Sequence, residues 1–349
     1  MSETKISRLD YIDALRGAMI LMVVYFHLIF RIDPFGSGFH SDFAEAMRSI
    51  RMPLFFFITG FLACAIYNPA LFKKRLHNRM RRQLVPTVII FIIYIVVTRK
   101  GFTGAVMSDN KAGYWFTYSL VQVWLIYAIL ALIFSRLRLS QRTVFFIILA
   151  ITICLIPLKY NENGMYPVIF DTRLSQFFSF FRTVSFAPFF FMGVLIRMNY
   201  PVMQRLLDRL RSKHRCDIAL LLLTLILFVA LIPSNKSYII RLSEIAGITA
   251  ILITFYITRR YWSSDNIIAS NLRILGKNTL PIYLYHMFFL TPLNYGLLDW
   301  LADYEGMFHV EFPVLITLSV IISALCVIAD RLLKRLPAVH SFIFGSDNR

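Results

Sequence analysis

Apolar segments of nearly membrane-spanning length recur along the whole chain. Ten stand out, at about residues 13–30, 52–67, 84–98, 114–134, 143–158, 177–196, 217–232, 239–258, 274–298 and 313–333. Hydrophobic residues make up 58% of the 349 residues and charged residues 16%, whereas soluble domains average about 45–50% and about 25%. The pattern argues against a soluble or disordered chain and predicts an all-α polytopic membrane protein with about ten transmembrane helices.

Basic residues are concentrated in every second connection between these segments. If the N-terminus lies inside, the inner stretches hold 24 Lys and Arg, the outer stretches hold nine, and four lie within segments. Positive residues favour the cytoplasmic side of membrane proteins, so this alternation predicts that both termini are cytoplasmic. It also accounts for the net charge of +18 without nucleic-acid binding.

Other features limit the chemistry that the chain can perform. Its four cysteines are scattered, without the spacing of a metal site or a disulfide framework, so we expect no metal. It contains no G-x-S-x-G, Walker or H-E-x-x-H motif. The first apolar segment is too long for a cleavable signal peptide. We expect a single domain over residues 1–349, without internal repeats.

The first apolar segment carries two polar residues that the membrane disfavours. Arg16 and His27 are 11 residues apart, close to three full helical turns, so their side chains share one face about 16 Å apart along the axis. Arg16 would lie near the cytoplasmic end and His27 in the outer half. The structural alternatives are a snorkelling arginine, with Asp13 as its partner, and a packed histidine. Their shared face favours a function.

The next polar groups are arginines. Arg51 precedes Pro53, a residue suited to a helix start, at the outer end of the second segment. In the basic stretch 68–83, Arg75, Arg79 and Arg82 follow i, i+4, i+7 and would form one stripe if helical. Such a stripe either anchors the chain at anionic lipid or binds phosphate, because the guanidinium fork matches multi-oxygen anions.

Polar residues also occur in the later segments. His286 is predicted at mid-bilayer, where Pro281 disturbs the helix and leaves carbonyls that need partners. The structural alternative for His286 is a core histidine. Arg241 and Glu244 have the i, i+3 spacing of an ion pair.

Four residues of the middle segments complete this set. Gln122 and Arg182 are further polar groups predicted within the membrane, with no assigned role. Tyr114 and Trp115 are predicted to belong to the aromatic belt at the outer interface.

Four stretches of the chain together resemble a known family. They read YIDALRGAMILMVVYFH at 11–27, RMPLFFFITGFL at 51–62, KRLHNRMRRQLVP at 74–86 and GKNTLPIYLYH at 276–286. The first is similar to the opening signature of the acyltransferase-3 family, bacterial integral membrane O-acyltransferases. The others resemble its Phe-rich, Arg-x-x-Arg and late Tyr-Leu-x-His elements, in the same order. The element around residue 114 is only loosely matched.

The resemblance implies an activity and a set of site residues. An acyl group, usually acetyl, would pass from cytoplasmic acyl-CoA to a hydroxyl of a glycan or lipid-linked sugar. His27 would be the catalytic base or a transient acyl carrier, and Arg16, Arg79 and Arg82 would bind the coenzyme phosphates. Arg51 and His286 match motifs, with substrate positioning or structural support both open.

The resemblance also implies a cellular location and a domain composition. It places the protein in the bacterial cytoplasmic (inner) membrane, with no permanently bound cofactor. We expect none of the soluble SGNH-type hydrolase domains that some relatives append. The acyl chain, the acceptor position and the oligomeric state stay open.

Two other classes of function remain. A ten-span transporter or exporter would suit the intramembrane Arg, His and Glu residues and the helices interrupted by Pro, but the two halves of the chain show no similarity. A structural subunit of envelope assembly would tolerate replacement of Arg16 and His27. Consumption of acetyl-CoA distinguishes the acyltransferase from both.

Overall fold

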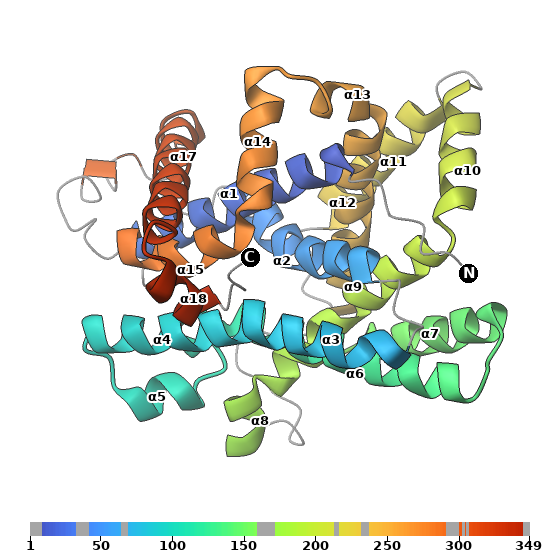
Figure 1. Cartoon of the computed structure of the whole chain (residues 1–349). Helices are drawn as coiled ribbons and strands as arrows, with labels where there is room; N and C mark the ends of the chain where they lie inside the picture. Colours follow the sequence, from blue (N-terminus) through green and yellow to red (C-terminus); the bar gives the residue numbers. More distant parts are fainter. Residues whose placement is uncertain are drawn as a thin grey trace.

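The computed structural model describes residues 9–32, 42–63, 69–158, 172–212, 216–231, 237–290, 300, 301, 304 and 307–344. Within these ranges the regular structure is entirely helical (Figure 1). The helices are α1 (Asp10–Ile32), α2 (Asp42–Ala63), α3 (Pro69–Arg79), the π-helix η1 (Met80–Leu84), α4 (Val85–Val97), α5 (Phe102–Met107), the 3₁₀ turn η2 (Lys111–Gly113), α6 (Trp115–Arg136), α7 (Gln141–Leu155), α8 (Arg173–Phe178), α9 (Phe180–Met198), α10 (Tyr200–Ser212), α11 (Cys216–Leu231), α12 (Ser237–Ile257), α13 (Arg259–Trp262), α14 (Ile267–Lys277), α15 (Thr279–Leu290), α17 (Phe308–Leu333) and α18 (Pro337–Phe344).

Among the described residues, seven helices are long and apolar enough to cross a membrane. They are α1, α2, the continuous helix from Phe72 to Val97, α6, α9, α12 and α17. Three further apolar helices, α7, α11 and α15, are shorter. Each of the ten predicted segments overlaps one of these helices, which confirms an all-helical fold with several helices of spanning length. The exact number of spans stays a prediction.

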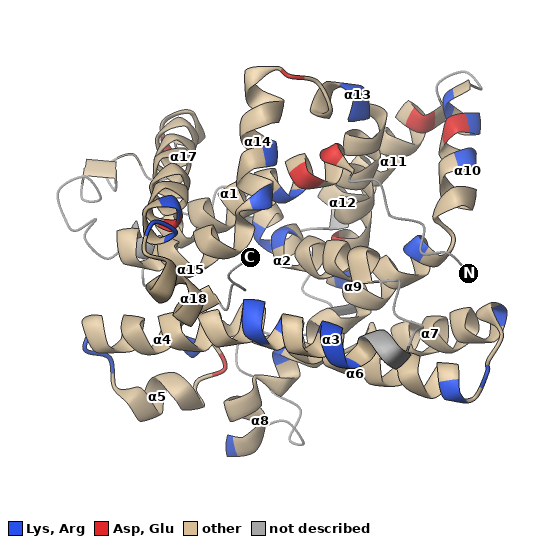
Figure 2. Cartoon of the chain, viewed as in Figure 1, with Lys and Arg blue, Asp and Glu red and all other residues tan. Residues whose placement is uncertain are grey.

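Basic residues occur on stretches of both predicted sides, and the turn between α4 and α5, predicted to be outside, carries Arg99 and Lys100. Figure 2 shows Lys and Arg on α3, α10 and α13 and at the turn between α6 and α7. These positions belong to four of the basic stretches predicted to be cytoplasmic. The orientation of the chain in the membrane, and with it the side of the termini, stays a prediction.

Several connections predicted between segments contain helices. Within the basic stretch 68–83, α3 begins at Pro69, continues into η1 and runs without a break into α4. The second segment also begins earlier than predicted, because α2 starts at Asp42 and Pro53 lies inside it rather than at its start. A proline within a membrane helix is tolerated where neighbouring groups satisfy the freed carbonyl. The prediction of a helix start at Pro53 was therefore wrong.

The predicted segment 274–298 is interrupted at Asn278, between α14 and α15. Pro281 has no N–H to donate, and its ring would clash with the Lys277 carbonyl four residues earlier, so α14 ends there. Nδ2 of Asn278 donates a hydrogen bond to the Ile274 carbonyl at 2.8 Å and satisfies the end of α14. Residues 291–299 lie outside the described part of the chain.

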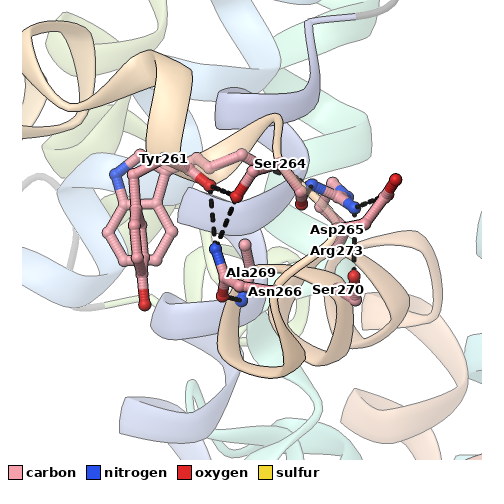
Figure 3. Close-up of polar contacts among 8 residues, drawn as sticks. Tyr261, Ser264, Asp265, Asn266, Ala269, Ser270 and Arg273 are labelled. Atoms are coloured by element: carbon pink, nitrogen blue, oxygen red, sulfur yellow. Dashed lines mark hydrogen bonds and ion pairs between the residues drawn. The ribbon is translucent and has the colours of Figure 1, made fainter.

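The start of α14 is fixed by a polar turn (Figure 3). Oδ1 of Asn266 accepts the N–H of Ala269 at 2.8 Å, which is an N-cap. Nδ2 of Asn266 donates to the Tyr261 carbonyl, and Arg273 donates to the Ser264 carbonyl at 2.7 Å. The stretch 259–273, expected to be a connection, is therefore mostly helix, and its second helix packs against α1.

Glycines bring α14 against α1. A Cβ atom added to Gly17 would lie 1.9 Å from the carbonyl oxygen of Leu272, and one on Gly276 would lie 1.8 Å from that of Asp13. No side chain fits in either place, so the two backbones touch directly. Helices α2 and α9 approach each other in the same way, through Gly60 and Gly193.

The aromatic residues near position 114 are buried. Tyr114 is 1% exposed, and its hydroxyl donates to the Leu284 carbonyl at 3.0 Å. In return, the Tyr283 hydroxyl donates to the Gly113 carbonyl at 2.8 Å. Trp115 is buried as well and stacks on Phe186. The prediction of an exposed interface belt was therefore wrong for both residues, because η2 packs against α15.

The ion pair predicted in the eighth segment is confirmed. Nη1 of Arg241 lies 2.9 Å from Oε2 of Glu244, and both residues are buried. Arg241 also donates to the carbonyls of Leu158 and Ser185. It thus joins α12 to the end of α7 and to α9, which is a structural role.

Candidate active site

A cavity of about 510 Å³ opens between five parts of the fold: α1, α2, the α3–η1 segment, α6 and α15. We call the part lined by its four arginines the basic end, and the part lined by aliphatic and aromatic side chains the apolar wall. None of the described residues that line the cavity is Asp or Glu. Its lining consists of Arg16, Ile20, Val23, Phe55, Ile58, Thr59, Leu62, Ala63, Arg75, Asn78, Arg79, Arg82, Gln83, Phe116, Thr117, Leu120, Trp124, Thr279, Leu280 and Tyr283.

Four arginines line the basic end. Arg75 and Arg79 lie one turn apart on α3, and Arg82 lies on η1. Arg16 faces them from α1. Arg75 and Arg79 are half-buried and Arg82 is exposed. The i, i+4, i+7 stripe predicted from the sequence is therefore helical and faces a cavity, which places several guanidinium groups around one space and suits a multi-oxygen anion.

Neighbouring side chains hold two of these arginines, Arg16 and Arg79, in place. Nη2 of Arg16 donates to Oγ1 of Thr279 at 2.8 Å, and Nη1 lies 3.6 Å from the carboxylate of Asp13. The guanidinium of Arg79 lies over the ring of Trp124, 5.4 Å from its centroid. Thr279 is available because the helix break at Asn278 starts a new helix there.

Arg82 lies in the π-helical turn η1, which carries no buried residue. Such turns are rare and occur often at functional sites. The turn is stabilised by Thr87, whose hydroxyl donates to the Gln83 carbonyl at 2.7 Å and lies 3.0 Å from the Thr117 hydroxyl. Gln83 and Thr117 both line the cavity, so η1 and α6 are joined at its wall.

The apolar wall follows one face of α1. Arg16, Ile20 and Val23 line the cavity and have the i, i+4, i+7 spacing of a single helix face. His27 is the next residue on that face, one turn or about 6 Å beyond Val23. His27 itself is not among the lining residues. Because α1 is one continuous helix, the pitch places Arg16 and His27 on the same face, and the part of α1 that lines the cavity ends at Val23, one turn short of the histidine.

Two histidines meet beyond the apolar wall. The ring centroids of His27 and His286 are 5.0 Å apart, at an interplanar angle of 51°. The ring of His286 also lies 5.9 Å from that of Tyr283, which lines the cavity. The guanidinium of Arg51 stacks on Phe26, 3.4 Å from its centroid, next to His27 in the chain. This second polar group draws on α1, α2 and α15.

The hydrogen bonds of His286 define its tautomer. Nδ1 lies 2.7 Å from the carbonyl oxygen of Tyr283, and a carbonyl only accepts hydrogen bonds. We therefore assign the proton to Nδ1, which leaves a lone pair on Nε2. Nε2 is buried and has no hydrogen-bond partner in the described part of the chain. His286 as a whole is 1% exposed.

The structure thus divides the six predicted site residues into two groups. Arg16, Arg79 and Arg82 line the cavity, whereas Arg51, His27 and His286 gather beyond its apolar wall. Their roles stay predictions. Arg75, predicted only as part of the stripe, joins the first group.

The sequence analysis missed Thr279, Thr117 and Trp124 as lining residues. Thr279 lies within the late motif, which could have indicated it. For Trp124 and Thr117 no local signal exists, because their place depends on how α6 packs against α3 and η1. No group of three or more His, Cys, Asp or Glu side chains that could hold a metal ion occurs among the described residues.

The comparisons with known proteins give one match. A family model described as an acyltransferase domain matches residues 9–328. That stretch contains every residue of the cavity lining and both histidines. No curated protein and no solved structure matches the chain.

Proposed function

Because the chain belongs to the acyltransferase-3 family, we propose that it moves an acyl group from cytoplasmic acyl-CoA to a hydroxyl of a glycan or lipid-linked sugar. We expect this acyl group to be acetyl. Several of its helices are long and apolar enough to cross a membrane. We place it in the bacterial cytoplasmic membrane, where the coenzyme reaches the basic end of the cavity.

One observation carries the proposal: an arginine cluster and a histidine pair lie at the two ends of one helix face. Coenzyme A is a phosphate-rich head on a long thin arm. The head binds at Arg16, Arg75, Arg79 and Arg82, the four basic residues of the lining. The arm follows Ile20 and Val23 along α1, towards the histidines. This arrangement directs the thioester from the phosphate site along α1 towards the base, which lies one turn beyond the cavity lining.

The chemistry requires a base and a leaving group. His27 accepts the proton of the acceptor hydroxyl while the oxygen attacks the thioester carbonyl, and the C–O bond forms. The tetrahedral intermediate then collapses and the C–S bond breaks. The imidazolium of His27 returns its proton to the thiolate, which leaves as coenzyme A. The guanidinium of Arg51, near the histidines, supplies positive charge for the oxyanion.

The test is transfer of label from [¹⁴C]acetyl-CoA to an alkali-labile ester in washed membranes that contain the protein. We expect His27→Ala to lower the initial rate at least about 100-fold, because a general base contributes about 10²–10⁴-fold. Arg82→Gln should raise the KM for acetyl-CoA about 10-fold or more, since a charge-assisted hydrogen bond contributes about 1.5–3 kcal/mol.

Arg81→Gln is the matched control for Arg82→Gln. Arg81 lies on the same π-helical turn but not in the cavity lining, so its variant should keep the wild-type KM. Equal effects at the two positions would indicate a general loss of positive charge rather than a phosphate site. A His27→Ala variant with the wild-type rate, or membranes that transfer no label, would overturn the proposed function and favour a transporter.

A further inference from the structure

We propose that His286 is a positioning residue that fixes the tautomer of His27. In this arrangement Nε2 of His286 accepts the ring N–H of His27, directly or through one water molecule. The other nitrogen of His27 then presents its lone pair to the acceptor hydroxyl. The inference rests on the proposed function, in which His27 is the base.

The first argument is the lone pair on His286. The Nδ1 proton is committed to the Tyr283 carbonyl at 2.7 Å. Nε2 is therefore an acceptor, and it is buried without a partner among the described residues. A buried polar atom without a hydrogen bond costs about 1–3 kcal/mol, so such an atom calls for an explanation. A donor from His27 or from a bound water supplies one.

The second argument is the distance between the rings. The 5.0 Å between centroids places the two imidazole edges close together. Nitrogens across such a gap are within reach of a hydrogen bond of about 2.9 Å after a small ring rotation. Arg51 also lies near His27, because its guanidinium stacks on the ring of Phe26, the preceding residue. Arg51 only donates hydrogen bonds, so it does not compete with His286 for the role of acceptor.

The third argument is the rigidity of His286. Its ring packs against Tyr283, whose hydroxyl is tied to the Gly113 carbonyl at 2.8 Å. The first turn of α15 also carries Thr279, which binds Arg16. One short helix therefore contacts both the phosphate site and the base. It holds the acceptor nitrogen in place while His27 becomes an imidazolium, as the carboxylate does in a serine-protease triad.

The expected effect is on turnover rather than on coenzyme binding. His286→Asn keeps a donor for the Tyr283 carbonyl but has no atom at the position of Nε2. We expect its kcat to fall about 10- to 100-fold at an unchanged KM for acetyl-CoA. His286→Gln places an amide oxygen near the position of Nε2 and should recover about half of this loss on a logarithmic scale.

A spectroscopic readout separates positioning from structural support. In ¹⁵N-histidine-labelled protein in nanodiscs, with His27→Ala used for assignment, solid-state NMR should show one tautomer of His27. In His286→Asn the two tautomers should mix. An unchanged His27 signal with unchanged kcat in this variant would overturn the inference.

Two further outcomes are distinguishable. If His286→Asn does not fold, the wild-type spectrum decides, and a mixture of His27 tautomers there would overturn the inference. If wild-type membranes transfer no acetyl group, the proposed function fails. The tautomer measurement needs no turnover, so it still tests the contact between the two histidines by itself.

Discussion

Two pairs of helices, labelled in Figure 1 as α1 with α14 and α2 with α9, make the same kind of contact. In each pair, a glycine on either helix faces a carbonyl of the other. We call them the α1–α14 pair, with Gly17 and Gly276, and the α2–α9 pair, with Gly60 and Gly193. In each case an added Cβ atom would lie 2.0 Å or less from a backbone oxygen. The two pairs are therefore equally intolerant of side chains at these positions.

The surroundings of the two contacts differ. Polar side chains adjoin the α1–α14 contact, where Arg16 binds Thr279 and lies near Asp13. The α2–α9 contact is surrounded by buried aromatic rings, such as Phe57 and Phe190. The same backbone approach thus supports the basic end of the cavity in one pair and a largely apolar part of its lining, on α2, in the other. Rigid packing is the shared requirement, and the neighbouring side chains decide the function.

The largest effects are expected from the glycines themselves. Gly17→Ala and Gly60→Ala should each cost about 3 kcal/mol or more, because the new methyl meets backbone that cannot move aside. Gly104, with no atom within 4 Å of an added Cβ, is the control, and Gly104→Ala should be neutral or stabilising by about 0.5–1 kcal/mol. The measurement is the thermal midpoint in detergent.

The KM for acetyl-CoA of the same variants also tests the difference between the two helix pairs. Among the molecules that fold, Gly17→Ala should raise the KM for acetyl-CoA more than Gly60→Ala does, because Gly17 is next to Arg16 of the phosphate site, whereas Gly60 is next to Thr59, an uncharged residue of the lining. Equal KM values in the two variants would show that the α1–α14 pair is scaffold only.

The next largest effect contrasts two arginines. Arg241→Met removes the cation that pairs with the buried carboxylate of Glu244 and should cost about 3–5 kcal/mol, with little change in KM among molecules that fold. Replacing Glu244 by Gln as well should recover much of this loss. Arg16→Gln should change stability by less than about 1 kcal/mol, because the Arg16 side chain is 28% exposed, but should raise the KM for acetyl-CoA about 10-fold.

Chemical denaturation and acetyl-CoA titration check this pair of predictions. A large loss of stability in Arg16→Gln, with KM unchanged, would reassign Arg16 to the scaffold together with Arg241.

The smallest effect is expected at Thr279. Thr279→Val removes the hydroxyl that binds Arg16 and should raise the KM for acetyl-CoA about 5-fold, which corresponds to about 1 kcal/mol. Thr279→Ser should behave as wild type. Thr249, whose hydroxyl donates only within its own helix, to Ile245, is the control, and Thr249→Val should leave KM unchanged. A 5-fold change in both valine variants would exclude a specific role for Thr279.

Much of the helical framework could be predicted because its signals are local. The length of an apolar run indicates a helix of spanning length, and 3.6 residues per turn places Arg16 and His27 on one face. The same periodicity placed Arg75, Arg79 and Arg82 on one stripe, which the structure shows lining the cavity.

The errors arose where a residue's neighbours come from other helices. Tyr114 has the character of an interface residue, yet its hydroxyl meets the Leu284 carbonyl and the ring is buried. The stretch 259–273 is basic and short on apolar residues, so it resembled a connection, although α14 packs along α1. Neither contact can be predicted from the periodicity of the sequence, because each joins two separate helices.

By itself, the sequence determined the helical class, the approximate helix positions, and the shared face of Arg16 and His27. These follow from hydropathy and helical pitch, which act over a few turns of one segment. Only the tertiary structure decided that Thr279 binds Arg16 across 263 positions of the chain, and that His286 meets His27. Those contacts depend on how closely separate helices approach, and that distance is set by the glycines and by side-chain packing between helices.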